Sequence, residues 1–264
     1  MREHLYERAI TFPAYGEVAV PVQGVEGVFL VDIRSDILRR IVFSGSYEPH
    51  AIAAIRRVLP AKGDVIDIGA NIGIFTVLMA QAVGNRRVLA IEPTPAVARR
   101  LQHNISGNAV AANVIVEQCA VGSESGSVTM SIVSGMEEYS TVGELVLPNT
   151  AGRPATSVTV PMHTLDELVA RHGLKPTLIK MDIEGSEMRA LSGATASLSR
   201  YRPTILAEVN DRMLTAAGSS AAAVLGFLRL RGYSLQRVDG GEMDSDAGFI
   251  GDVLAIHADG PAAE

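Results

Sequence analysis

The chain has 264 residues, of which 47% are hydrophobic and 20% are charged, and its formal net charge is −6. This composition suits one large globular domain with a small appendage. An acidic chain without tryptophan is a poor match for a nucleic-acid substrate. No apolar stretch reaches the roughly 18 residues of a membrane span, and the N-terminus lacks the apolar core of an export signal. The single cysteine excludes an internal disulfide and a cysteine zinc site, so we expect a cytoplasmic protein without nucleic-acid or membrane partners.

The first 46 residues predict a small extension rather than a separate domain. Two short apolar runs, 18–22 and 28–33, are typical of a strand pair, and Asp36 is placed to cap a short helix. We expect this extension, residues 1–46, to pack over the mouth of a ligand site. The next segment, Tyr47-Glu48-Pro49, predicts the start of a helix because proline favours the first helical turn.

Residues 64–73 carry more information about function than any other segment. An apolar run reaches Asp67 and then breaks at Gly69, Asn71 and Gly73, after which a helical pattern begins. This predicts a buried parallel strand, a tight turn and a crossover helix, the first unit of a nucleotide-binding α/β sheet. The nicotinamide fingerprint requires glycine at position 71, where this chain has asparagine. The turn is a better match for the S-adenosylmethionine loop of class I methyltransferases.

An acidic residue ends the next apolar strand, 87–91. Glu92 lies 19 residues beyond Gly73, about where a doubly wound fold places the carboxylate that holds both ribose hydroxyls. One ionised carboxylate is a good bidentate acceptor for two neutral hydroxyls. A lone glutamate at a strand end is more often simply solvated, but the turn before this one favours the ribose role. Pro93 then stops the strand.

The remaining elements alternate in the manner of an α/β domain. A third strand is expected over 113–120, and two further strands, 127–133 and 157–161, flank the long connection 134–156. Connections of this length are often lids, so we expect it to cover the substrate, the alternative being a disordered excursion. Thr164 and Glu167 have the spacing of a capping box. The elements expected after it are strands over 178–183, 204–209, 233–238 and 252–257, a helix over 219–231, and a loose tail over 259–264.

Three blocks of residues occur in the order that one family shows. They are the turn at 67–73, Ile91-Glu92-Pro93, and Leu178-Ile179-Lys180-Met181-Asp182-Ile183-Glu184-Gly185-Ser186-Glu187. Together with Tyr47-Glu48 and Thr164-Leu165-Asp166, they make residues 47–208 resemble the FkbM-type methyltransferases. The resemblance implies a doubly wound α/β fold over residues 47–258, with the seven-stranded, Rossmann-like sheet of class I methyltransferases. It also implies S-adenosylmethionine-dependent O-methylation of a small molecule, often a sugar or polyketide hydroxyl in natural-product biosynthesis.

Ligands of an open parallel sheet bind outside the carboxyl ends of its strands. Residues at five such ends should therefore converge on one cleft: Asp67, Glu92, Cys119, Asp182 and Glu208. We expect the methionine end of S-adenosylmethionine over Gly69–Gly73 and its adenine beside Cys119, which would be a packing residue rather than a nucleophile. The residues predicted to bind the cofactor are Tyr47, Glu48, Asp67, Gly69, Asn71, Gly73, Glu92, Pro93, Cys119, Ala120 and Asp182.

A hydroxyl must lose its proton as the methyl group is transferred, which requires a positioned base or a cation. Asp182 is the first candidate for the catalytic base, and two other roles stay open for it, holding the amino group of the cofactor and capping the next helix. His163 is the second candidate, because it is the only histidine near these segments, although a lone histidine is more often structural. Glu184 and Glu187 lie at the start of a helix, where carboxylates are favoured, so we expect structural roles for both.

A metal-assisted mechanism is the alternative to a base. Asp182, Glu208 and Asn210 offer three oxygen ligands from neighbouring strand ends, which suits Mg²⁺. Catechol O-methyltransferases have a similar arrangement, although Glu208 and Asn210 are not adjacent in the chain. Two further functions stay open, a non-catalytic S-adenosylmethionine-binding protein and a NAD-dependent oxidoreductase of similar fold, which would lack its glycine fingerprint here. The sequence leaves the acceptor and the oligomeric state open.

Overall fold

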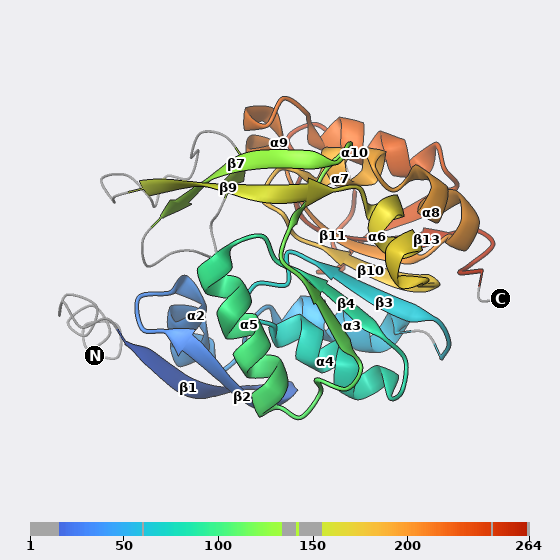
Figure 1. Ribbon diagram of the computed structural model, residues 1–264. Coiled ribbons are helices and arrows are strands. Elements are labelled where there is room, and N and C mark those ends of the chain that lie inside the picture. Colours follow the sequence, from blue (N-terminus) through green and yellow to red (C-terminus); the bar gives the residue numbers. More distant parts are fainter. Residues whose placement is uncertain (1–15, 60, 134–140, 143–154, 244, 263–264) are drawn as a thin grey trace.

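The computed structural model describes residues 16–59, 61–133, 141–142, 155–243 and 245–262. Within these residues a seven-stranded sheet forms the centre of the protein, in the order β12-β13-β11-β10-β3-β4-β5 (Figure 1). The five strands from β11 to β5 pair in parallel, whereas β13 and β12 are antiparallel. The strands are β3 (Asp64–Ile68), β4 (Val88–Ile91), β5 (Val114–Glu117), β10 (Pro176–Met181), β11 (Thr204–Asn210), β12 (Tyr233–Arg237) and β13 (Ile250–His257). The predicted doubly wound sheet is confirmed, including its antiparallel final pair.

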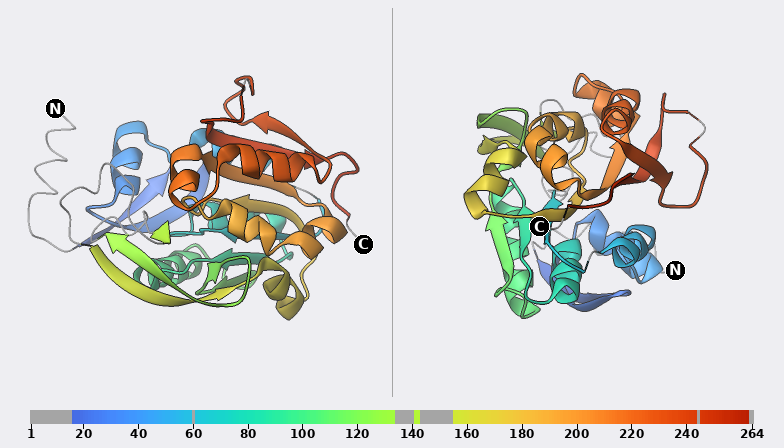
Figure 2. Two further views of the ribbon diagram at one scale, coloured as in Figure 1. Left: turned by 90° about the horizontal axis from the view of Figure 1, so that it is seen from above. Right: turned by 90° about the vertical axis from the view of Figure 1, so that its right-hand side faces the viewer.

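Helices cover both faces of this sheet (Figure 2). One face packs against α3 (Pro49–Val58), α4 (Ile74–Val83) and α5 (Pro95–Gly107), and the other against α6 (Leu165–His172), α8 (Thr195–Tyr201) and α10 (Ala221–Arg229). Neighbouring residues of a strand point to opposite faces, so Val65 belongs to the first core and Ile66 to the second. Because both faces are covered, most residues of the central strands are apolar, which explains the hydrophobic runs in the sequence.

The chain reverses its direction across the sheet between β3 and β10. From β3 it runs outward through β4 to β5, and later it returns to the other side of β3 with β10 and β11. At such a switch point the connections leave neighbouring strand ends in opposite directions, which opens a crevice for a ligand. The segments that follow β3 and β10 border this crevice.

The N-terminal extension forms a hairpin and a helix. β1 (Glu17–Val22) pairs antiparallel with β2 (Val25–Asp32), and α2 (Asp36–Ser44) follows. The cap of α2 is Ser35, whose hydroxyl accepts the N–H of Ile37 at 3.0 Å, and not Asp36 as expected. Asp36 lies in the first turn instead and pairs with Arg40 at 2.8 Å. The hairpin packs on α4 and α5, on the first face of the main sheet (Figure 1).

A second sheet has four strands among the described residues, in the order β6-β9-β7-β8 (Figure 1). Its strands are β6 (Ala120–Val121), β7 (Gly126–Val133), β8 (Thr141–Val142) and β9 (Ala155–His163). The expected third strand, 113–120, is split, because β5 ends at Glu117 and Ala120 pairs with Met162 of β9. The predicted lid, 134–156, lies largely outside the described residues, which include only β8 and the start of β9 within it.

The C-terminal tail is attached to the main domain as far as it is described. The N–H of Ala262 donates to the carbonyl oxygen of Tyr201 at 2.8 Å, and Asp259 pairs with Arg202 at 2.8 Å. The tail expected to be loose, 259–264, is therefore held through Ala262.

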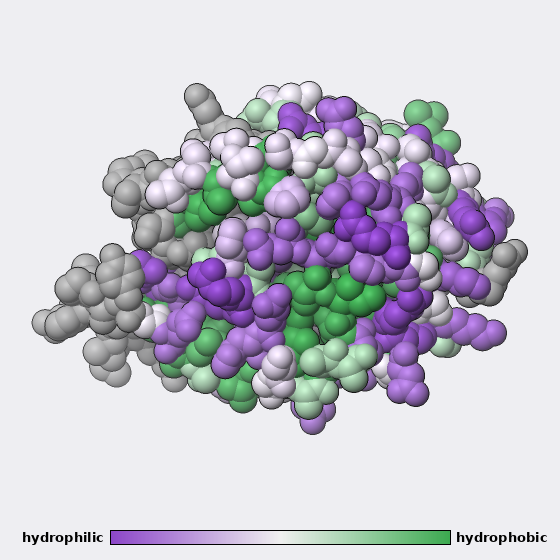
Figure 3. Space-filling view, in the orientation of Figure 1, coloured by the Kyte–Doolittle hydropathy of each residue, from purple (hydrophilic) through white to green (hydrophobic). Residues whose placement is uncertain are grey.

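The face seen in Figure 3 carries an apolar area on the side of β5. This strand forms one edge of the main sheet, and Val114, Ile115 and Val116 are each partly exposed.

No helix among the residues described here is both long enough and apolar enough to cross a lipid bilayer.

Candidate functional site

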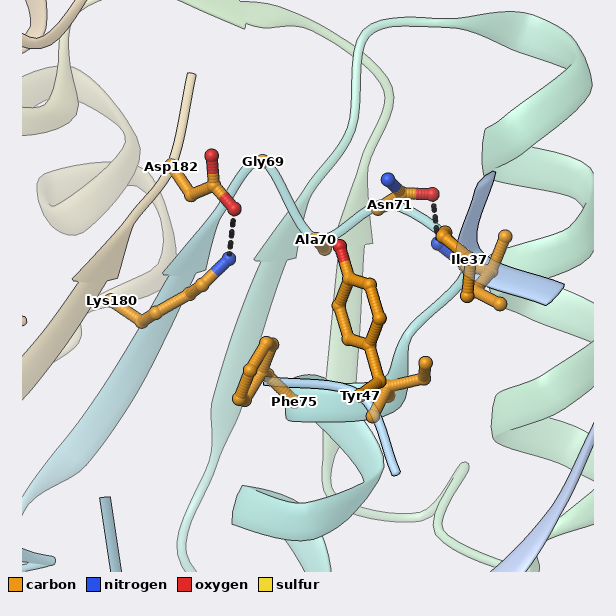
Figure 4. Close-up of a pocket in the computed structure, with 10 residues that line it drawn as sticks. Ile37, Tyr47, Gly69, Ala70, Asn71, Phe75, Lys180 and Asp182 are labelled. Carbon is orange, nitrogen blue, oxygen red and sulfur yellow. Dashed lines mark hydrogen bonds and ion pairs between the residues drawn. The ribbon is translucent and has the colours of Figure 1, made fainter. Parts of the chain in front are cut away.

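A pocket opens at the switch point between β3 and β10 (Figure 4). Five segments build it: α2, the residues before α3, the loop between β3 and α4, the first turn of α4, and the end of β10. Its lining residues are Ile37, Tyr47, Gly69, Ala70, Asn71, Ile72, Ile74, Phe75, Lys180 and Asp182. The structure therefore brings together the glycine turn and Asp182, which the sequence placed at one cleft, and adds Ile37 from the N-terminal extension.

Backbone hydrogen bonds to the end of β4 hold the start of the loop from Gly69 to Gly73. The N–H groups of Gly69 and Ala70 both donate to the carbonyl oxygen of Ile91 at 3.0 Å. Gly69 has φ +78°, and a Cβ there would stand 1.8 Å from the carbonyl oxygen of Asp182. The two segments of the pocket thus touch at a point where only glycine fits. Asn71 also has a left-handed backbone, and its Oδ1 accepts the N–H of Ile72 at 2.8 Å (Figure 4).

Glu92 is joined to this loop. Its Oε2 accepts the N–H of Asn71 at 3.1 Å, and its Oε1 accepts the N–H of Thr94 at 2.8 Å. The side chain is 7% exposed, and burial raises the pKa of Glu92 to about 7 although both N–H groups act to lower it. The ribose role stays a prediction, and the contact with Asn71 places the carboxylate at the loop where that role requires it.

Lys180 is a pocket residue that sequence reasoning missed. Its side chain is buried, its Nζ donates to Oδ2 of Asp182 at 3.1 Å, and it lies 4.8 Å from the centre of the Phe75 ring (Figure 4). Strand register also sets Lys180 opposite Asp67. Burial alone would lower the pKa of Lys180, but Asp182, Asp67 and Glu48 raise it above its usual value, so the ammonium stays charged. A lysine inside an apolar strand was the available signal, because a buried lysine needs a partner.

Asp67 lies under the loop and is fully buried. Its Oδ2 accepts the hydroxyl of Thr76 at 2.6 Å, whereas its Oδ1 has no hydrogen-bond partner among the described residues. Burial raises the pKa of Asp67, and the nearby Lys180 opposes that rise. Asp67 therefore binds the first part of α4 and is not among the residues that line the pocket.

Carboxyl groups gather at the ends of β10, β11 and β13. Strand register places Asp182 beside Glu208, and Glu208 opposite Asp252. Burial alone would raise the pKa of Asp182, but the Lys180 ammonium and a hydrogen bond from Glu208 lower it below its usual value. The charge of Asp182, together with burial, raises the pKa of Glu208 to about 11. At neutral pH Asp182 is therefore ionised and Glu208 holds the proton between them.

Two of the three expected metal ligands lie together with a further carboxyl group. Oxygen atoms of Asp182, Glu184 and Glu208 lie within 4.8 Å of one another, so Glu184 joins Asp182 and Glu208 at this place. Asn210 caps α9 (Asp211–Ala216), and its Oδ1 accepts the N–H of Arg212 at 3.2 Å. Three carboxyl groups at this separation suit either a hard divalent cation or a shared proton.

Tyr47 and Glu48 stand where the N-terminal extension meets the pocket. Tyr47 packs against Phe75 with ring centres 6.2 Å apart, and the guanidinium of Arg40 lies 5.7 Å from the Tyr47 ring. Glu48 has φ +45°, and its carboxylate is 3.6 Å from Arg40. Burial and the charge of Asp182 raise the pKa of Glu48 to about 7. Tyr47 thus lines the pocket, while Glu48 belongs to the group of acids around Asp182.

The residues predicted near adenine lie between the two sheets. Cys119 follows β5 and is 2% exposed, and burial raises its pKa to about 12, so the thiol stays protonated. Ala120 is the first residue of β6, and Pro93 follows Glu92 at the end of β4. None of the three is among the pocket residues given above. The contact of Cys119 and Ala120 with adenine, and the cofactor-binding role of Pro93, stay predictions.

His163 lies at the end of β9 in a polar network outside the lining of the pocket. Its Nδ1 is 3.1 Å from Oε2 of Glu167, and Nη2 of Arg171 is 3.4 Å from the same ring nitrogen. The Thr164 hydroxyl accepts the N–H of Glu167 at 3.1 Å, as the capping box requires. The Glu167 carboxylate binds Ser125, His163 and Arg171. The catalytic role of His163 stays a prediction.

Glu187 has the structural role expected of it. Its Oε1 accepts the N–H groups of Ile183 at 3.3 Å and of Gly185 at 3.2 Å, so the carboxylate holds the turn that follows Asp182. Glu184 lies in this turn with φ +51°. Glu184 was expected to be structural too, but the turn carries its carboxyl group to Asp182 and Glu208.

Known proteins resemble a large part of this chain, including the loop after β3 and the end of β10. A family model, the methyltransferase FkbM domain, matches residues 67–235. The AMB antimetabolite synthetase AmbE of Pseudomonas aeruginosa is 29% identical over 208 residues, covering 67% of this chain and 10% of AmbE. The 31-O-demethyl-FK506 methyltransferase FkbM of Streptomyces tacrolimicus is 30% identical over 203 residues, covering 66% of this chain and 74% of that protein.

A solved structure also matches, at lower sequence identity. The crystal structure of methyltransferase FkbM from Methylobacillus flagellatus KT matches with a TM-score of 0.48 and 18% identity, covering 74% of this chain and 44% of that chain. Among the curated relatives, the chain spans less than two thirds of the length of AmbE and of two further methyltransferases.

Proposed function

Because the chain belongs to the FkbM methyltransferase domain family, we propose that it methylates a hydroxyl oxygen of a small molecule of the sugar or polyketide type. Family membership accounts for the use of S-adenosylmethionine as methyl donor. An oxygen acceptor is supported by the relative from Streptomyces tacrolimicus, whose name specifies a 31-O-demethyl compound. It is also supported by Asp182, because a hydroxyl acceptor needs a base and an amine acceptor needs it less.

The proposed cofactor site consists of the loop from Gly69 to Gly73, Glu92, and the segment at Cys119 and Ala120. A bare backbone at Gly69 lets the methionine end of the cofactor approach the loop closely. The Glu92 carboxylate would accept the two ribose hydroxyls with the lone pairs that the N–H groups of Asn71 and Thr94 leave free. Apolar contacts and backbone groups near Cys119 would hold the adenine.

The position of Asp182 is the observation that carries the proposal. Its backbone N–H donates to the carbonyl oxygen of Ile68 at 3.0 Å, and its own carbonyl lies against Gly69, so it is fixed beside the start of the loop. Bound S-adenosylmethionine supplies an electrophilic methyl group on a sulfonium. The ionised Asp182 carboxylate would accept the proton of the acceptor hydroxyl, while Lys180 and Glu208 keep that carboxylate in one orientation.

The proposal is tested by methyl transfer from labelled S-adenosylmethionine to a panel of hydroxylated sugars and polyketides. Mass spectrometry of the product should place the methyl group on oxygen. Asp182→Asn keeps the shape of the side chain and removes the proton acceptor, so turnover should fall roughly 10²–10⁴-fold. Binding of S-adenosylhomocysteine to this variant should change far less.

The matched control is Asp252→Asn, which removes a carboxylate from the same row of strand ends without touching the loop. It should reduce turnover much less than Asp182→Asn. A product methylated on nitrogen or carbon would contradict the oxygen acceptor. A fully active Asp182→Asn variant would remove the base role from Asp182.

A further inference from the structure

Two asparagines on α5 bind the backbone of β2. Asn108 accepts the N–H of Val28 and donates to the carbonyl oxygen of Val28, both at 2.9 Å. Asn104, one helical turn earlier, accepts the N–H of Leu30 at 2.7 Å and donates to the carbonyl oxygen of Leu30 at 3.2 Å. In a strand, alternate residues direct their backbone groups to the same edge, so the two side chains bind the edge of β2 that β1 does not use.

Asn104 differs from Asn108 in one contact. Its Nδ2 also donates to the carbonyl oxygen of Ile72 at 2.8 Å, inside the loop from Gly69 to Gly73. The corresponding second bond of Asn108 returns to its own helix, at the carbonyl oxygen of Asn104. Asn104 is 1% exposed, and its amide uses both N–H donors on two carbonyl groups from different segments.

The bond to Ile72 adds to the hydrogen bonds that hold the backbone of the loop. The N–H of Asn71 is bound by Glu92, the N–H of Ile72 by the Asn71 side chain, and the N–H of Gly73 by the carbonyl oxygen of Ala70 at 2.9 Å. Ile72 itself is buried, so without Asn104 its carbonyl oxygen would lose this bond in a place that water reaches poorly. An acceptor buried without a donor is unfavourable, and the loop would move to relieve it.

We infer that Asn104 is a positioning residue for the cofactor loop, and that it couples this loop to the hairpin of β1 and β2. The inference rests on the proposed placement of the cofactor over Gly69–Gly73. Asn104 touches neither the pocket nor the reacting atoms and acts only through the carbonyl group of Ile72. Because coupling between two sites is reciprocal, a ligand that orders the loop should also stabilise the backbone of β2 at Leu30.

Asn104→Ala and Asn108→Ala form a matched pair for the test. Both remove one side-chain anchor of β2, but only the first releases the loop. Calorimetry with S-adenosylhomocysteine should show a dissociation constant about tenfold higher for Asn104→Ala, the effect of one lost hydrogen bond. Asn108→Ala should stay within about twofold of the unchanged protein, and kcat at saturating cofactor should change less than KM in both. Equal effects of the two variants would overturn the inference.

Glu92→Ala separates this inference from the function on which it rests. Normal binding by Glu92→Ala would show that the cofactor site itself is wrongly placed. If Glu92→Ala bound S-adenosylhomocysteine weakly, but Asn104→Ala and Asn108→Ala had the same dissociation constant, the cofactor site would be correctly placed and Asn104 would have no positioning role.

Hydrogen exchange on the unchanged protein keeps the test valid if Asn104→Ala does not fold. Saturating S-adenosylhomocysteine should slow exchange of the β2 amides at Val28 and Leu30, although β2 does not line the pocket. The amides of β12, an edge strand on the far side of the sheet, serve as the reference. Protection of the loop peptide without any change in β2 would contradict the coupling.

Discussion

Replacing Glu92 should weaken the binding of S-adenosylhomocysteine by an amount that the structure allows us to calculate. Its two carboxylate oxygens already accept the N–H groups of Asn71 and Thr94, and the Thr94 side chain also binds the carboxylate, so the ribose hydroxyls would use the remaining lone pairs. Losing a charged hydrogen-bond acceptor costs about 1.5–3 kcal/mol. The dissociation constant of Glu92→Ala should therefore rise roughly 10-fold to 150-fold.

The same carboxylate should make cofactor binding depend on pH. Burial raises the pKa of Glu92 to about 7, so in the free protein the group is protonated below this pH and ionised above it. The ionised form accepts both hydroxyls, whereas the protonated form has one acceptor fewer and must lose its proton first. The dissociation constant should fall as the pH rises toward about 7 and then level off. Glu92→Gln cannot titrate, so this slope should disappear.

Calorimetry across this pH range measures both effects. Glu117→Gln is the control, because Glu117 ends the neighbouring strand but binds Nε2 of His172 at 2.6 Å instead of the loop. It should change neither the affinity nor the pH dependence. Unchanged binding in Glu92→Ala, or a slope that persists in Glu92→Gln, would refute the assignment of Glu92 to the ribose.

Three further outcomes are expected. Turnover should survive exhaustive chelation, because the proton shared by Asp182 and Glu208 already relieves the repulsion between their carboxyl groups. If chelation abolished activity and Mg²⁺ restored it, a metal-assisted mechanism would take the place of base catalysis by Asp182. His163→Gln should lower turnover less than tenfold, because the ring is engaged with Glu167 and Arg171, and a roughly 10²-fold loss with normal folding would transfer the base role to it. Burial raises the pKa of Glu187 to about 7 and of Glu184 to about 8, so the free energy of unfolding should fall as the pH rises from the usual range of glutamate to about 8. Thermal melting at a series of pH values measures this loss of stability. A melting midpoint that does not fall would show that Glu184 and Glu187 ionise without destabilising the folded protein.

The loop and its acid could be predicted from the sequence because each is a local pattern. Gly69, Asn71 and Gly73 mark a turn between a strand and a helix, and the distance to Glu92 follows from the length of one crossover unit. The structure adds the reason for Gly69, whose missing side chain makes room for the backbone of Asp182. That contact joins residues 113 positions apart, and no periodicity in the chain reports it.

The composition of the acidic group was harder to predict, because it depends on how a turn is folded. Glu208 and Asn210 both lie at the end of the strand next to that of Asp182, which favoured Asn210 as a partner of Asp182. In the structure β11 ends at Asn210, whose side chain caps the next helix. The left-handed backbone of Glu184 then brings a different carboxyl group to Asp182. Lys180 was overlooked for a similar reason, since Asp67 and Phe75, which lie near it, belong to distant segments of the chain.

The short link between the two sheets has a practical consequence for protein engineering. Only Gln118 and Cys119 separate β5 from β6, and β6 is joined to β9 through Ala120 and Val121. A chimaera could therefore exchange residues 126–160 as one cassette while keeping 118–122 and 162–163 from this chain. Grafts cut inside 118–122 would break the pairing with β9 and disturb the end of β5 at the same time. Cassette boundaries chosen outside that link should give folded hybrids, in which the proposed role of residues 134–156 in covering the acceptor can be tested.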